Sequence, residues 1–115
     1  MIYHIVPHEA WTAAQAAGIY RGDTLEAEGF IHFSMREQVL YVADARFKAH
    51  TGLLLLAVDE SKLDAELKYE PPYENAPDAL GLFPHLYGAL NLDAVMGVYP
   101  FEPNDDGTFT FPVEM

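Results

Sequence analysis

The sequence predicts an α+β fold for residues 1–115, taken as a single domain. Two segments with helical periodicity lie in the first half of the chain, and each follows a segment of strand character. The second half consists mostly of short strands separated by turns, which favours antiparallel pairing, because parallel strands need long connections. At 115 residues and 50% hydrophobic content, the chain is near the common size of one domain and can fill one core.

The first half alternates strand and helix. Residues 1–6 are rich in β-branched and aromatic side chains and are expected to form the first strand. The alanine-rich segment 8–18 is expected to be a helix, and Gly18 is placed to end it. A turn at residues 20–25 then leads into a second strand at residues 29–33.

The second helix is expected to run from Met35 to about Lys48. Ser34 stands at the N-cap position and Glu37 follows three residues later, which is the spacing of a capping box. Apolar residues three to four positions apart are expected to face the core, namely Val39, Val42, Ala43 and Phe47.

The second half opens with a strongly apolar segment. Residues 53–58, LLLLAV, form a continuous apolar run, which predicts a strand buried on both faces. A turn or single helical turn at residues 59–64 leads to a short strand at residues 65–70. Residues 71–82 are expected to be a loop with three prolines, and a loop of this length is usually functional or mobile.

A hairpin is predicted at the end of the chain. Residues 94–101 and 108–113 have strand character. Asp106 and Gly107 lie between them and are a strong signal for a tight turn. The last two strands are therefore expected to pair with each other.

The composition excludes several kinds of protein. Cysteine is absent, which excludes disulfides, thiolate metal sites and cysteine nucleophiles, and this fits the reducing cytoplasm. The N-terminal segment lacks the basic start and apolar core of a signal peptide, and the longest apolar run is too short to span a bilayer. We therefore expect a cytoplasmic protein with no membrane segment.

The charge balance bears on the ligand. Six basic and 18 acidic residues give a formal net charge of −12, which argues against binding to a nucleic-acid backbone. Solubility is the simplest reason for such acidity. Four of the six bases lie in the first half, namely Arg21, Arg36, Arg46 and Lys48. An anionic small molecule is therefore expected to bind to that half.

Three of the five histidines lie inside apolar, aromatic segments: His4, His32 and His85. A histidine in such a segment must have its ring nitrogens hydrogen-bonded or lie at the mouth of a pocket. One interpretation is three separate core histidines, each bonded to a backbone carbonyl. The other is that the three rings line a common cleft, and this is our working hypothesis.

The residues that follow His32 favour an anion site. His32 and Ser34 share strand parity, and Ser34 lies where the strand turns into a helix, whose N-terminal N–H groups attract anions. Arg36 lies in the first helical turn, where its charge opposes the helix dipole, so a phosphate or carboxylate ligand would explain it. An ordinary exposed arginine is the alternative.

Glu70, His85 and Tyr87 are further candidates. Glu70 closes a strand beside the long loop, where catalytic carboxylates are common, with surface charge as the alternative. His85 and Tyr87 share strand parity and suit stacking on a flat ring such as adenine, or equally packing in a core. The sequence contains no Gly-rich phosphate loop, no HExxH and no GxSxG motif. Three histidines and Glu70 could bind zinc or iron, but they lack a characteristic spacing, so no metal ligand is assigned.

Five segments together resemble the small bacterial family called domain of unknown function 952. They are YHI, AAQAAGIY, EGFIHFS, LKYE and FPHLYG, and the resemblance runs from residue 2 to about residue 99. The family has no established activity. Its fold is remotely related to the ADP-ribosyltransferase superfamily, which holds NAD in a cleft between two small antiparallel sheets. The resemblance thus implies an ADP-ribosyltransferase-like fold with two small, mostly antiparallel sheets, and NAD as the cofactor.

The resemblance also suggests residue roles. In ADP-ribosyltransferases a histidine on the first strand bonds the ribose beside the nicotinamide, and His4 is at the matching position. Many members add an aromatic residue that stacks on the nicotinamide and a late glutamate that polarises the ribosyl bond, and neither has a clean match here. His32 and Ser34 lie where the second motif would fall, and Glu70 is an analogue of the glutamate.

The sequence therefore predicts a protein that binds a nucleotide-like or phosphorylated ligand in a His-lined cleft, with transferase or hydrolytic activity at a ribose. The candidate catalytic residues are His4, His32 and Glu70, and the candidate ligand-binding residues are Ser34, Arg36, Arg46, His85 and Tyr87. Glu70 is expected to stabilise an oxocarbenium-like centre or to act as the base. The alternatives are a non-enzymatic module that binds a basic protein through the acidic segment 59–78, and a mononuclear metal hydrolase.

Overall fold

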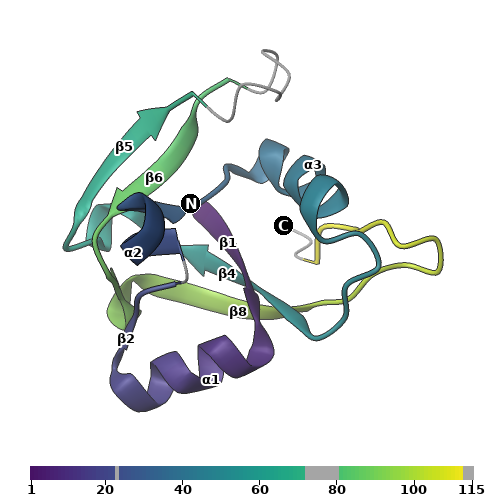
Figure 1. The fold of residues 1–115 in the computed structure, drawn as a ribbon, viewed down its shortest axis with the longest axis horizontal. Coiled ribbons are helices and arrows are strands. Elements are labelled where there is room, and N and C mark those ends of the chain that lie inside the picture. Colours follow the sequence, from purple (N-terminus) through teal and green to yellow (C-terminus); the bar gives the residue numbers. More distant parts are fainter. Residues whose placement is uncertain (23, 72–80, 113–115) are drawn as a thin grey trace.

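The structure is a computed structural model that describes residues 1–22, 24–71 and 81–112. In these ranges the strands form three antiparallel sheets (Figure 1). The first sheet has the strand order β1 (Ile2–Pro7), β4 (Leu53–Val58), β8 (Val95–Phe101). The second sheet has the strand order β3 (Ile31–His32), β6 (Phe83–Tyr87), β5 (Glu66–Glu70). The third sheet pairs β2 (Ile19–Tyr20) with β7 (Leu90–Asn91). The predicted α+β class with antiparallel sheets is confirmed, and the short third sheet is an addition to the two expected.

The α-helices of the described residues all lie in the first half of the chain, as predicted. They are α1 (His8–Ala17), α2 (Thr24–Glu28) and α3 (Arg36–Arg46), and single 3-10 turns follow at η1 (Glu60–Lys62) and η3 (Leu92–Ala94). Gly18 ends α1 with a φ of 81°, and its N–H donates to the Ala14 carbonyl at 2.8 Å. The sequence did not predict α2, which occupies part of the expected turn, and the strand that follows is shorter than expected. Among the described residues, no helix has the length and apolar character needed to cross a membrane.

β4 is the centre of the hydrophobic core, as its unbroken apolar sequence predicts. Side chains alternate across a strand, so Leu56 and Val58 pack on one face of the first sheet, and Leu53 and Leu55 pack on the other. Figure 1 shows α1 on one side of this sheet and α3 on the other. Each helix therefore covers one face of the same central strand.

The two faces of the sheet carry separate clusters of buried side chains. The first core cluster consists of Ile2, Val6, Trp11, Ala14, Tyr20, Ile31, Phe33, Leu56, Val58, Leu86, Leu90 and Ala94. The second core cluster consists of Tyr3, Val39, Ala43, Leu53, Leu55, Ala57, Phe101, Phe109 and Phe111. β1 contributes to both by alternation, and its even positions, which include His4, share the face of the first cluster.

The capping box predicted for α3 is wrong by one residue. Ser34 is not the N-cap, because its backbone pairs with β1: the Ser34 N–H donates to the Tyr3 carbonyl and the Tyr3 N–H donates to the Ser34 carbonyl, both at 2.8 Å. Met35 is the N-cap, and Gln38 is the third helical residue. The Gln38 side chain accepts a hydrogen bond from the Met35 N–H at 2.8 Å, which is the contact expected of Glu37.

The predicted C-terminal hairpin forms its turn but not its second strand. The Asn104 N–H donates to the Thr108 carbonyl at 2.7 Å, which closes the predicted turn. Residues 108–111 form no strand, and the Phe109 and Phe111 side chains pack in the second core cluster instead. The Phe109 ring stacks on Phe101, with centroids 4.7 Å apart. β8 pairs with β4, and the described residues 108–112 form no strand.

The loop predicted at residues 71–82 falls mostly on residues 72–80, which lie outside the described residues. The strand before it is β5, within one residue of the predicted limits, and the helical turn predicted before β5 is η1.

Candidate functional site

A cleft of about 790 Å³ opens along the outer edge of β1. β1 pairs with β4 along its whole length, whereas on its other edge the described residues show one isolated bridge, between Tyr3 and Ser34, which follows β3. Beyond this bridge, His4 and Ile5 line the cleft, together with residues of α1, β2, α3, β6 and the segment 30–34. The cleft thus lies where the two three-stranded sheets diverge.

The three histidines from apolar segments all line this cleft, as the working hypothesis requires. His32 on β3 is the direct register partner of His85 on β6, and the two ring centroids are 5.3 Å apart. His4 reaches the same region from β1. Elements far apart in the sequence therefore bring these imidazoles together.

His4 connects three elements through its ring nitrogens. Nδ1 lies 2.6 Å from the His32 carbonyl oxygen, and Nε2 lies 2.8 Å from the Tyr20 hydroxyl. A carbonyl oxygen only accepts hydrogen bonds, so Nδ1 carries the proton, and Nε2 of the neutral ring accepts from Tyr20. Both interpretations of the buried histidines, a cleft-lining ring and a core ring bonded to a backbone carbonyl, therefore apply to His4.

His85 is held by a carboxylate that does not line the cleft. Its Nδ1 donates to Glu70 Oε1 at 2.8 Å, and the Tyr87 hydroxyl donates to the same oxygen at 2.6 Å. These two hydrogen bonds, first that of Tyr87 and then that of His85, lower the pKa of Glu70 from its ordinary value. Neither Glu70 nor Tyr87 is among the described residues that line the cleft; Glu70 is bonded to His85, and Tyr87 is bonded to Glu70.

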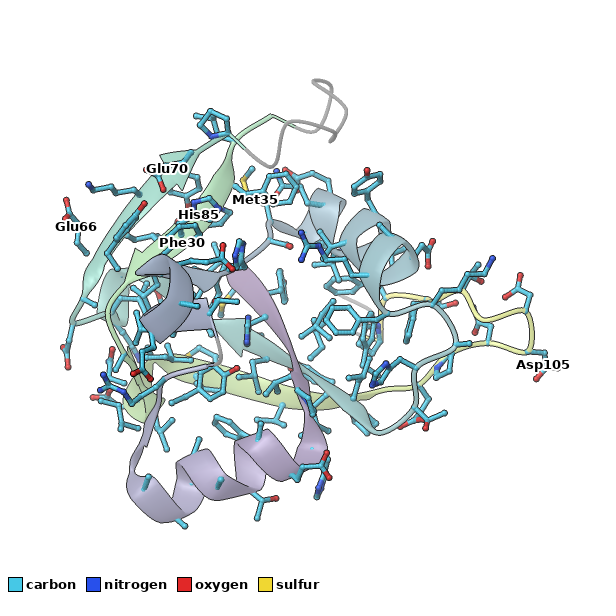
Figure 2. All side chains as sticks on the ribbon, viewed as in Figure 1. Phe30, Met35, Glu66, Glu70, His85 and Asp105 are labelled. Atoms are coloured by element: carbon cyan, nitrogen blue, oxygen red, sulfur yellow. The ribbon has the colours of Figure 1, made fainter. Side chains whose placement is uncertain are left out.

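Phe30 is a site residue that the sequence analysis missed. Its ring stacks on His85, with centroids 4.2 Å apart and planes 23° apart, and it also contacts the rings of His32 and Tyr87. Figure 2 shows the Phe30, His85 and Glu70 side chains close together beside β6. The alternation that puts His32 and Ser34 on one face includes Phe30, so strand parity could have identified it.

His32 has a carboxylate partner of its own. Its Nε2 lies 3.1 Å from Glu28 Oε1 at the end of α2. Burial lowers the pKa of His32, and the hydrogen bond and charge of Glu28 only partly oppose this shift, while His85 and Arg46 add to it.

The lowered pKa of His32 predicts a loss of stability in mild acid. The unfolded chain takes up this proton at a pKa of about 6.5, above the pKa of the folded protein, so folding is favoured above pH 6.5 and weakens as the pH falls through the folded value. We expect His32→Gln to flatten the fall in Tm between pH 7 and pH 5, measured by calorimetry. His8→Gln, at an exposed position of α1, is the control, and an equal effect of both variants would contradict this assignment.

The predicted cationic residues separate into two groups. Arg46 lines the cleft, and so does Arg21, which the sequence did not assign to the site; Ser34, the predicted neutral partner of the anion, also lines it. Arg36 does not line the cleft, because its guanidinium lies over the Phe111 ring, 4.4 Å from the centroid, where the second core cluster holds it. The phosphate role predicted for Arg36 is therefore not supported by its position. The described residues that line the cleft include no Asp or Glu.

The described residues give no support to either alternative function, the metal hydrolase or the module that binds a basic protein. No group of three or more potential metal ligands occurs in the described part of the chain, and His4, His32, His85 and Glu70 do not form one. The acidic segment 59–78 extends into residues outside the described ranges.

Comparisons with known proteins agree on one relationship. A family model described as "Protein of unknown function (DUF952)" matches residues 5–98. The X-ray crystal structure of protein CC0527 from Caulobacter crescentus is 34% identical and has a TM-score of 0.82, covering 95% of this chain and 92% of that chain. Its solution NMR structure, also 34% identical, has a TM-score of 0.78, covering 93% and 89%. No curated protein matches this chain.

Proposed function

The chain belongs to the DUF952 family of proteins of unknown function. From the lining of its cleft, we propose that the protein binds a nucleotide-like or phosphorylated small molecule there. The observation that carries this proposal is the composition of the lining. Two arginines and three histidines line the cleft in a chain with a formal net charge of −12.

The cations of the lining support an anionic ligand. Arg21 follows β2 and Arg46 ends α3, so they approach the cleft from two separate elements. Both side chains are exposed, which suits guanidinium groups at the mouth of a site. Guanidinium groups bind phosphate through paired hydrogen bonds, and Arg is common where phosphate is recognised.

The size and the aromatic content of the cleft support a ligand with a flat ring. A volume of about 790 Å³ lies within the range of small-molecule sites, which is about 300–1,000 Å³. The rings that line it come from several elements and include Tyr3, Tyr20, Phe30, Phe33, Tyr41 and Phe47. Aromatic surfaces beside cations suit a purine joined to phosphates, so NAD and ADP-ribose are the first ligands to test.

Ribosyl transfer, which the resemblance to ADP-ribosyltransferases implies, has less support than binding. It needs a carboxylate beside the ribosyl bond, and Glu70 is directed to His85 and Tyr87. The ring nitrogens of His4 are both bonded within the protein. We therefore propose that His4 shapes the cleft and that Glu70 acts through His85.

Replacing Arg46 with alanine tests the proposed binding. We expect Arg46→Ala to weaken the binding of ADP-ribose or NAD by about 10- to 100-fold, because a hydrogen bond to a charged group contributes about 1.5–3 kcal/mol. The measurement is isothermal titration calorimetry at fixed salt concentration. Lys62→Ala is the matched control, since it removes the same charge from an exposed position outside the lining.

Two results would contradict the proposal. One is that neither NAD, ADP-ribose nor AMP binds to the wild-type protein. The other is that Arg46→Ala and Lys62→Ala bind a ligand with the same affinity as the wild type.

A further inference from the structure

We infer that His85 is a general base of the cleft and that Glu70 is its positioning residue, for the hydrolysis of a phosphodiester with a good leaving group. This inference rests on the proposed binding of a phosphorylated ligand and adds a reaction to it. Its starting point is the carboxylate–imidazole pair on β5 and β6, in which one partner lines the cleft and the other does not.

The Glu70 contact fixes which nitrogen of His85 carries the proton. The carboxylate accepts from Nδ1, so Nδ1 is protonated and Nε2 of the neutral ring is the basic nitrogen. A carboxylate on Nδ1 also stabilises the imidazolium that forms when Nε2 takes up a proton, as in the Ser-His-Asp arrangement. The pair thus has the two properties that a histidine base needs.

Several contacts hold this base in one orientation. His85 is 6% exposed and lies on a strand paired on both sides, opposite His32 on β3 and Lys68 on β5. Phe30 stacks on the ring. The Tyr87 hydroxyl fixes the Glu70 oxygen that His85 uses. A catalytic group on a rigid element with a fixed partner meets the geometric demand of general base catalysis.

The other two histidines of the cleft are less suited to this role. His4 uses one nitrogen for the His32 carbonyl and the other for Tyr20. His32 directs Nε2 to Glu28. Each of these histidines has its own carboxylate partner, Glu28 for His32 and Glu70 for His85. His85 is the more deeply buried of the two, and a tyrosine hydroxyl holds its carboxylate partner in place.

The proposed step is the attack of water on phosphorus. Nε2 of His85 accepts a proton from a water molecule as the water oxygen forms a bond to phosphorus. The bond from phosphorus to the leaving oxygen breaks, and its electron pair stays on that oxygen. His85 then releases its proton to solvent. Because no separate acid is assigned, the inference is confined to leaving groups that depart as anions, such as an aryl oxide.

The test uses bis(p-nitrophenyl) phosphate, an anionic aromatic phosphodiester whose leaving group is yellow. We expect the wild-type protein to hydrolyse it and His85→Gln to lower kcat by about 10²- to 10⁴-fold, the usual contribution of a general base. Glu70→Gln is expected to lower kcat and to change the pH profile of kcat, with KM nearly unchanged in both variants. Lys62→Ala is the control, and melting curves establish that each variant is folded.

The pH profile includes contributions from other groups near His85. These are Glu70 and Lys68 on β5, Tyr87 on β6, His32 on β3 and Glu28 beside His32. Glu70→Gln should therefore be compared with Tyr87→Phe, which removes one of the two hydrogen bonds to Glu70 and is expected to lower kcat by a smaller factor. Tyr69→Phe is matched to it, because Tyr69 on β5 donates to Glu60 of η1 and neither residue lines the cleft.

A spectroscopic readout separates a positioning role from a merely structural one. Nitrogen-15 NMR of the imidazoles should show the Nδ1-protonated form of His85 in the wild type, and a mixture of both neutral forms in Glu70→Gln. Unchanged hydrolysis by His85→Gln would overturn the inference, as would an unaltered tautomer in Glu70→Gln. If the phosphodiester or ADP-ribose binds without any hydrolysis, the inference fails and the proposed binding stands; if nothing binds, both fail.

Discussion

Replacing Leu55 with alanine is expected to lower the free energy of unfolding by about 2–5 kcal/mol. Leu55 is fully buried at the centre of β4, between its register partners Ile5 on β1 and Tyr99 on β8. Its side chain belongs to the second core cluster, so its removal leaves a cavity beneath α3. The loss combines the transfer of the deleted methyl groups with the cavity that the neighbours fill only partly.

Urea denaturation measures this effect, and Leu82→Ala is the matched control. Leu82 loses the same atoms but is 47% exposed, so its change is expected to stay within about 1 kcal/mol. Equal losses for the two variants would contradict the placement of Leu55 in the core. Leu55→Ala also places a core defect next to the candidate site, because Ile5, the register partner of Leu55, lines the cleft.

Gln38→Leu is expected to destabilise the protein by about 2–5 kcal/mol, although leucine is of similar size and more apolar. Gln38 is fully buried, and its side chain accepts from the Met35 N–H and donates to the Leu82 carbonyl, each at 2.8 Å. Leucine leaves both backbone groups without these bonds, and each unsatisfied buried group costs about 1–3 kcal/mol. Thermal and urea unfolding measure the loss.

Gln15→Leu is the control for this substitution. Gln15 lies on the exposed side of α1, so the same change there is expected to alter the free energy of unfolding by no more than about 0.5 kcal/mol. A wild-type-like stability of Gln38→Leu would show that water or rearrangement replaces both bonds. The expected loss would show instead that Gln38 joins the start of α3 to the chain just before β6.

The elements that the sequence predicted well are those that local pattern determines. The LLLLAV segment is β4 because a continuous apolar run suits only a strand covered on both sides. α1 ends at Gly18 because glycine adopts the left-handed conformation of the helix end without a steric penalty. His4, His32 and His85 also line one cleft, which their positions in apolar segments suggested but strand parity alone did not establish.

The elements that the sequence predicted wrongly depend on distant residues. Ser34 has the local signal of an N-cap, but pairing with Tyr3, which lies 31 positions away by their residue numbers, determines its backbone. Phe109 has strand character, but the second core cluster offers its ring greater burial than an edge strand would. The Glu70–His85 contact could not be predicted either, because it depends on the register of β5 against β6.

The shared use of β4 has a consequence for how the protein unfolds. The first core cluster and the second core cluster occupy opposite faces of the same strand, so each loses its central residues when β4 leaves the sheet. Neither cluster can come apart as an independent foldon while the other persists. We therefore expect the two halves of the interior to melt in concert, as one cooperative unit.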